Sequence, residues 1–257
     1  MQGDKPMEPR QGARYGALDA LRSVALVWMT LYHFGFDLSH FGYWVQDFRA
    51  SPVWTLQRTA IVSLFLLCVG MGQAVAASQG VGWQRFWRRW VRIAVCALLV
   101  SAGSFAMFPH SFIYFGVLHG IALMWLIARF TAGWGRWLWL AGALALASPW
   151  VAQGLLAGPL AQWAQVFNGK ALNWIGWITH KPFTEDYVPL FPWMGVVWWG
   201  MAIGQWLLAR RPGWLALDMG GAGKALALLG RHSLPWYMLH QPVMIGAIMA
   251  FGWWLHP

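Results

Sequence analysis

Residues 18–38 read LDALRSVALVWMTLYHFGFDL, an apolar stretch of the length that a membrane-spanning helix needs, and it carries Asp19, Arg22, His33 and Asp37. Arg22 and His33 are eleven residues apart, which is about three helical turns or ~17 Å of rise. Asp19 lies three residues before Arg22, and Asp37 lies four residues after His33, so all four side chains project from one stripe of the helix. Ionisable groups at membrane depth are costly and by default mark a functional site. We therefore expect the stripe to face a protein-lined cavity and not lipid.

The composition of the whole chain is typical of a polytopic membrane protein. Of the 257 residues, 59% are hydrophobic and 10% are charged, whereas a soluble domain usually carries about a quarter charged residues. The 22 tryptophans suit the aromatic belts at the two membrane interfaces and need no cofactor to explain them. We predict an all-α membrane bundle of about seven transmembrane helices plus one broken or re-entrant segment, embedded in the lipid bilayer.

Seven stretches are apolar enough and long enough for membrane spans: residues 16–38, 54–78, 90–108, 112–131, 134–152, 188–209 and 233–256. Residues 153–177 are also apolar, but Gly and Pro interrupt them too often for a span, so we interpret them as re-entrant or interfacial. Residues 1–15 are expected to form a cytoplasmic N-terminal tail. Residues 16–257 are then a single transmembrane domain.

The basic residues orient this bundle. Most of the 18 lysines and arginines fall on the side of the N-terminus, and the other side holds Arg49, Arg58, Lys170 and Lys181. Because cytoplasmic loops collect basic residues, the N-terminus is expected in the cytoplasm and the C-terminus outside. The net charge of +10 then reflects topology, and no nucleic-acid partner is expected. The basic run Gln84–Arg92 is most simply an anchor of this kind, and the alternative is contact with anionic head groups or a nucleotide phosphate.

Two smaller features receive a structural interpretation. Cys68 and Cys96 lie in apolar runs without a metal-ligand pattern, so we expect buried reduced thiols and no metal. The glycine-containing stretch Val69–Gly72 favours close helix packing over phosphate binding.

Polar residues of separate spans are predicted to gather at two depths. The set toward the cytoplasmic half comprises Asp19, Arg22, Arg231, His232, His240 and Gln241. The set toward the outer half comprises His33, Asp37, Arg58, His119 and Asp186. This arrangement suits a tunnel through the membrane in which a ligand enters from one side and reacts near the other.

The chemistry of these residues favours proton exchange beside a fixed positive charge. His33 and His119 exchange protons near neutral pH, and Asp186 or Asp37 can orient an imidazole and stabilise its charged form. For either histidine taken alone, a hydrogen-bonded core residue is an equally good interpretation.

The arginines suit an anionic ligand. Arg22 and Arg58 offer positive charge to a phosphate, a carboxylate or a developing oxyanion. Asp19 can neutralise Arg22 as an i, i+3 pair, and the alternative is that this pair is purely structural. Two classes of function fit such residues, an intramembrane enzyme and a proton-coupled carrier of a small anionic solute. The carrier is less favoured because the spans show no inverted halves and the polar groups lie at two levels.

Several stretches in chain order resemble the heparan-alpha-glucosaminide N-acetyltransferase catalytic-domain family, closest to its small bacterial members within the wider transmembrane acyltransferases. They are Leu18–Ala25 (LDALRSVA) with Tyr32–Phe34 (YHF), Gln57–Ala60 (QRTA) with Phe65–Gly70 (FLLCVG), Phe115–Ala122 (FGVLHGIA), Asp186–Trp193 (DYVPLFPW), and Leu229–Leu234 (LGRHSL) with Leu239–Val243 (LHQPV). Each stretch is weak alone, and together they span nearly the whole chain. The spacing from Arg22 to His33 is also similar to that of membrane O-acyltransferases that modify bacterial surface glycans.

The resemblance implies a transmembrane acyltransferase of the bacterial inner membrane. Such an enzyme takes an acyl group, usually acetyl, from cytoplasmic acyl-CoA and passes it to a hydroxyl or amine of a sugar or glycan on the periplasmic side. His33 then occupies the position of a catalytic residue and Arg22 that of a CoA-proximal arginine. The eukaryotic member looks to have an asparagine at the His33 position and its catalytic histidine in the first outer loop, where this chain offers His40. We favour His33 as the base.

From these considerations we expect two groups of site residues. Catalysis is assigned to His33, His119 and Asp186. Binding of acyl-CoA is assigned to Asp19, Arg22, Arg58, Arg231, His240 and Gln241. The expected reaction is direct attack of the acceptor on the thioester, with an acyl-histidine as the alternative. The acceptor, the acyl chain and homo-oligomer formation stay open.

Overall fold

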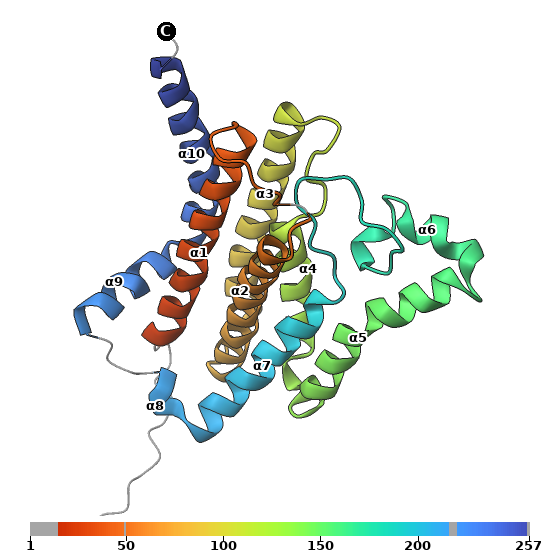
Figure 1. The fold of residues 1–257 in the computed structure, drawn as a ribbon. Coiled ribbons are helices and arrows are strands. Elements are labelled where there is room, and N and C mark those ends of the chain that lie inside the picture. Colours follow the sequence, from red (N-terminus) through yellow and green to blue (C-terminus); the bar gives the residue numbers. More distant parts are fainter. Residues whose placement is uncertain (1–14, 49, 216–219, 256–257) are drawn as a thin grey trace, which may run out of the picture.

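The computed structural model describes residues 15–48, 50–215 and 220–255, and the regular structure in these ranges is helical. The long helices are α1 (Gly16–His40), α2 (Pro52–Ser78), α3 (Trp83–Met107), α4 (Val117–Phe130), α5 (Trp137–Ala157), α7 (Trp193–Arg210) and α10 (Ser233–Leu255). The short ones are η1 (Ala132–Trp134), η2 (Ala161–Trp163), α6 (Ala164–Asn168), η3 (Asn173–Ile175), α8 (Pro212–Leu215) and α9 (Gly220–Arg231). Figure 1 shows α1 to α4 side by side, with α9 and α10 on one flank and α5 and α6 on the other.

The first helix has one apolar face and one polar face. Its outward face carries exposed apolar side chains, among them Val24, Val27 and Leu31, of which Leu31 is 65% exposed. On the other side Asp19 and Asp37 are buried, and α9 and α10 pack against the helix. The polar stripe of this helix therefore faces neighbouring helices, as predicted, but of its four residues only Arg22 lines the cavity described below.

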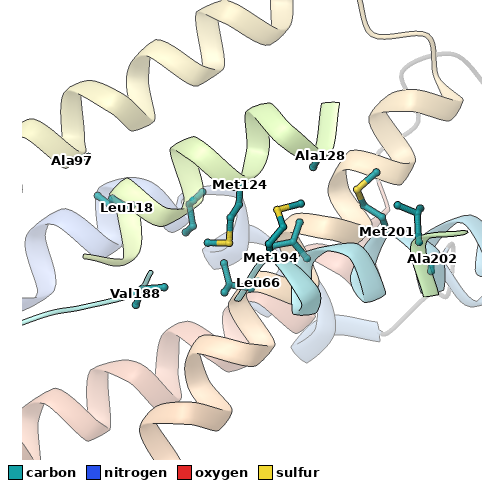
Figure 2. Close-up of a cluster of buried hydrophobic side chains, with 12 residues drawn as sticks. Leu66, Ala97, Leu118, Met124, Ala128, Val188, Met194, Met201 and Ala202 are labelled. Carbon is teal, nitrogen blue, oxygen red and sulfur yellow. The ribbon is translucent and has the colours of Figure 1, made fainter. Parts of the chain in front are cut away.

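The core of the bundle lies where α7 packs against α2. Gly70 of α2 faces the backbone of α7 at Val197, and Gly200 of α7 faces the backbone of α2 at Leu67, so a Cβ at either position would collide. Small residues of this kind let helix backbones approach closely, and the packing interpretation of Val69–Gly72 holds at Gly70. Around this contact, side chains of α2, α3, α4 and α7 form one buried apolar cluster (Figure 2).

A loop ahead of α7 covers the start of α4. A parallel bridge joins Phe115 to Tyr187, and the Val188 N–H donates to the Phe115 carbonyl at 3.2 Å. This loop carries Asp186 to the first turn of α4. The prolines at 189 and 192 oppose helix formation here, so α7 begins at Trp193 and not at 188 as predicted.

Three of the described helices are long and apolar enough to cross a membrane, namely α2, α3 and α5, and α4 is a shorter apolar helix. The protein is therefore a helical membrane protein, and the predicted number of seven spans is not reached by this criterion. The charges of α1 and the indole-rich sequence of α7 lower their hydropathy. The broken character of residues 153–177 is confirmed, since they contain the end of α5 and only short helices after it.

The starts of α3 and α4, like that of α7, differ from the prediction. Helix α3 begins at Trp83, so the basic run Gln84–Arg92 is helical and not a connector. Its first turns pack against α4, where the Phe86 ring contacts the Trp125 ring at a centroid distance of 5.7 Å and the Trp90 indole donates to the Ala122 carbonyl at 2.8 Å. Helix α4 begins at Val117 and not at 112. The tail 1–14, Arg49 and His256 lie outside the described residues.

Candidate active site

A cavity of about 360 Å³ lies between α1, α2, α3, α4 and the junction of α9 with α10. Arginines from three of these elements line it: Arg22, Arg89, Arg92 and Arg231. Much of the remaining lining is apolar and includes Phe65, Val69, Ile93, Val117, Leu118, Ile121 and Leu234. The cavity thus combines concentrated positive charge with an apolar wall.

The arginines and the start of α4 belong to opposite ends of this cavity. Helices α3 and α4 run antiparallel, since Trp90 bonds to Ala122 while Ser101 bonds to His119. Arg89 and Arg92, which flank Trp90, therefore lie level with the middle of α4, whereas Val117 and Leu118 lie a little more than one turn farther along, at its start. Tyr237 of α10 also lines the cavity.

Asp19 holds two of the arginines. Its carboxylate accepts from the Arg22 guanidinium at 2.9 Å and lies 3.8 Å from Nε of Arg231. The aspartate is buried, whereas a quarter of the Arg22 side chain is exposed. The carboxylate thus fixes the direction of two guanidinium groups that line the cavity. Sequence reasoning proposed Arg22 and Arg231, and missed Arg89 and Arg92 as individual site residues although the basic run signalled an alternative phosphate contact.

His119 is hydrogen-bonded through both ring nitrogens. The Gly116 N–H donates to Nδ1 at 3.3 Å, which assigns the ring proton to Nε2, 3.1 Å from the Ser101 hydroxyl. The Ser101 hydroxyl in turn donates to the Ile113 carbonyl. In this arrangement His119 ties the start of α4 to α3, which matches the core-histidine alternative.

Asp186 caps α4. Its carboxylate accepts from the Val117 N–H at 2.7 Å, at the positive end of the helix dipole. Burial raises the pKa of Asp186, although the Val117 N–H and the charges of Lys181 and Arg58 oppose the shift. No hydrogen bond among the described contacts joins Asp186 to His33 or His119, so the predicted role of orienting an imidazole has no geometric support. Burial likewise raises the pKa of Tyr187 on the same loop.

His33 lies at the contact between α1 and α10. Its ring meets the His240 ring at a centroid distance of 5.2 Å, and His240 meets Tyr237 of the cavity wall at 5.8 Å. One turn farther along α1, the Gln241 amide donates to Asp37 at 2.7 Å. A series of side-chain contacts therefore leads from the cavity to His33, although His33 itself does not line it.

This geometry corrects the predicted grouping of polar residues. His240 and Gln241 were placed with Arg231 in the cytoplasmic set, whereas the structure puts them against His33 and Asp37. The reason is α9, which the sequence analysis did not predict. This helix packs along the first turns of α1, so that α10 begins beside the middle of α1, where Trp236 donates to Thr30.

Three other predicted residues lie apart from the arginine cavity. Arg58 is half-buried on α2 and lies within electrostatic range of Tyr32 and Asp186. His232 is exposed beside the Leu228 carbonyl. His40, the alternative base, lines a separate cavity of about 260 Å³ between the end of α1 and the loop that follows.

The remaining reactive groups are two cysteines and the side chains that could bind a metal. Both cysteines are free thiols, and Cys68 is buried in the cavity wall as predicted, whereas Cys96 is only half-buried. Across the described ranges, no three His, Cys, Asp or Glu side chains gather as a metal-binding group.

Comparison with protein-family models finds a match over most of the chain. The family model for the heparan-alpha-glucosaminide N-acetyltransferase catalytic domain matches residues 14–242. No match was found among curated proteins or among solved structures. The matched range contains the arginine cavity, the start of α4 and the α1–α10 contact. The chain therefore belongs to the heparan-alpha-glucosaminide N-acetyltransferase catalytic-domain family, whose resemblance the sequence stretches had indicated.

Proposed function

We propose that the protein transfers an acetyl group from acetyl-CoA to a hydroxyl or amine of a sugar. The observation that carries this proposal is the cavity, with arginines toward one end and an apolar wall that continues to Val117 and Tyr237. Acetyl-CoA matches this layout, because its phosphates suit the arginines, its pantetheine arm suits the apolar wall, and its thioester would lie toward the far end. Guanidinium groups suit phosphates because of their fixed fork of donors. Arg22, Arg89, Arg92 and Arg231 would hold the phosphates.

Within this proposal His33 is the general base. It accepts the proton of the acceptor O–H or N–H while the oxygen or nitrogen attacks the thioester carbonyl carbon. The tetrahedral intermediate then collapses with cleavage of the C–S bond, and the departing CoA sulfur takes up the proton. Arg58 lies apart from the arginine cavity but within electrostatic range of Asp186 at the start of α4, and we propose that its charge stabilises the oxyanion from there. The support for His33 over His119 is that both nitrogens of His119 already have partners.

In this proposal Asp186 and His119 position the start of α4 and do not transfer protons in the reaction. Together they hold the first turn of α4, which carries Val117 and Leu118 of the cavity wall. We propose that they keep the thioester end of the cavity in shape.

The test is acetyl transfer by the purified full chain with isotope-labelled acetyl-CoA. We expect His33→Ala to abolish transfer while the Kd for CoA stays unchanged, and His110→Ala, at an exposed histidine, to behave as wild type. Turnover retained by His33→Ala would refute the assignment of the base, and His40→Ala then tests the alternative. Absence of any label transfer, together with solute flux into liposomes that follows a pH gradient, would instead identify a carrier.

The proposed topology follows the distribution of basic residues. The N-terminus and the arginine end of the cavity would face the cytoplasm of a bacterium, and the C-terminus would face the periplasm. Acetyl-CoA would then enter from inside and the sugar from outside.

A further inference from the structure

Three buried acceptor atoms occur together where α10 packs against α1. They are Oδ2 of Asp37, Oε1 of Gln241 and Nε2 of His240, and none has a hydrogen-bond partner in the described part of the chain. Asp37 is 3% exposed and His240 is 8% exposed. Buried polar atoms in native proteins are nearly always paired, so each exception requires an explanation. We call these three residues the α1–α10 seam.

The hydrogen bonds that are present show that all three atoms are acceptors. The Gln241 amide nitrogen donates to Oδ1 of Asp37, so the amide oxygen points elsewhere. Nδ1 of His240 lies 2.7 Å from the Tyr237 carbonyl, which can only accept, so this nitrogen carries the ring proton. In the neutral imidazole Nε2 is then a lone pair. A carboxylate oxygen, an amide oxygen and an imidazole nitrogen therefore all lack donors.

We propose that the α1–α10 seam binds the acetyl acceptor through hydrogen-bond donors of the acceptor, and that the acceptor is a neutral or cationic sugar and not an anionic one. A ligand with several O–H or N–H groups offers the donors that these acceptors lack. The carboxylate of Asp37 repels an acidic sugar, and no ion pair to it is found in the described contacts. This inference rests on the proposed function, because it places the acceptor beside His33, whose ring contacts His240.

The position of the seam agrees with this role. Asp37 lies one turn beyond His33 on the same face of α1, so a sugar bonded to Asp37 presents a neighbouring hydroxyl or amine toward His33. Tyr237, which contacts His240, lines the far part of the arginine cavity. His240 therefore lies between the proposed base and the cavity that holds the donor, whereas Asp37 and Gln241 lie one turn beyond the base, on the side away from the arginines.

The test compares kinetic constants for glucosamine as acceptor and acetyl-CoA as donor. We expect Asp37→Asn to raise the KM for glucosamine by about tenfold or more, as befits the loss of a hydrogen bond to a charged group. The KM for acetyl-CoA should stay within about twofold, since the seam does not line the cavity that holds the donor. Gln241→Met is a second variant with the same expected direction. Thr30→Val is the matched control, because it removes a satisfied α1–α10 hydrogen bond to Trp236 and leaves the seam intact.

A binding measurement separates this inference from the proposed function. Saturation-transfer NMR of glucosamine or glucose with the purified full chain needs no acetyl-CoA. Binding that is lost in Asp37→Asn supports the seam even if no acetyl transfer is found, which would refute only the proposed function. Transfer with an unchanged KM for glucosamine in Asp37→Asn and Gln241→Met overturns the seam alone. Failure of the wild type to bind either sugar, or competition by glucuronate equal to that of glucose, also overturns it.

Discussion

Arg22 gives the sharpest test of the arginine cavity. It lines the cavity, and its guanidinium is held at 2.9 Å by the buried Asp19. In the proposed complex this group donates to a phosphate of CoA. The substitution Arg22→Gln removes the charge and shortens the side chain while keeping a polar group. Arg210→Gln is the matched control, since Arg210 is exposed at the end of α7 and does not line the cavity.

The expected size of the effect follows from the exposure of Arg22. A hydrogen bond to a charged group contributes about 1.5–3 kcal/mol. A quarter of the Arg22 side chain is exposed, so solvent screening places the value near the lower limit. At about 1.5–2 kcal/mol, the Kd for CoA should rise roughly 10- to 30-fold. The ratio of the Kd of Arg22→Gln to that of the wild type should become smaller as salt is added, because ions screen the charges of the wild-type site.

Pantetheine distinguishes phosphate binding from a structural ion pair. Both interpretations of the Asp19–Arg22 pair predict some loss of stability in Arg22→Gln, so a melting temperature alone does not separate them. Pantetheine lacks the nucleotide and its phosphates, so Arg22→Gln should leave its affinity unchanged while that of CoA falls, as measured by isothermal titration calorimetry. An equal loss for both ligands, or none for CoA, would refute the reasoning, as would an equal loss in Arg210→Gln.

Other consequences concern stability and sidedness. Burial raises the pKa of Asp186 in the folded protein, so the folded state holds this proton more firmly than the unfolded state does. Stability should therefore fall as pH rises from the ordinary carboxyl range through the raised pKa. Melting curves of Asp186→Asn should lose this pH dependence, and an unchanged dependence would contradict the reasoning. Gly200→Ala should lower the melting temperature, with a cost of about 1–3 kcal/mol, because its Cβ would lie 2.5 Å from the Leu67 carbonyl oxygen. Gly103→Ala, which meets nothing within 4 Å, should stabilise α3 by about 0.5–1 kcal/mol, and equal melting of the two variants would oppose the packing argument. In proteoliposomes of known orientation, acetyl-CoA should support transfer only from the side of the N-terminus, and equal activity from both sides would exclude the proposed topology.

The polar stripe of α1 could be predicted from spacing alone, because helical periodicity is local. Asp19, Arg22, His33 and Asp37 follow one another after three, eleven and four residues, which are one, three and one helical turns, and the opposite positions are apolar. The cost of placing charge in lipid then decides which face is turned inward. The partners of the stripe are not local, and the sequence offered no rule for the register of α10 against α1.

The register of α10 against α1 depends on α9, and the amino-acid composition of α9 does not indicate a helix. Residues 220–231 read GGAGKALALLGR, and glycine lowers helix propensity, so this stretch resembles a connector. In the fold one of these glycines makes the helix contact possible, since a Cβ at Gly230 would collide with the Asp19 carbonyl of α1. Tertiary packing therefore outweighs propensity here. Helix α9 then sets where α10 begins and brings His240 to His33.

Helix α1 carries both the proposed phosphate position, which it forms with α9, and the proposed base, which it places against α10. Asp19 and Arg22 meet Arg231 at the start of α1, and three turns later His33 meets His240. A rigid helix keeps this separation, about 17 Å along its axis, whatever ligand is bound. A donor held by its phosphates at the first position therefore brings its reactive end toward the second only by extending along the cavity. In the proposed reaction this separation would place the phosphates of the donor and the acceptor at different levels of α1, which is the arrangement that transfer across the membrane requires.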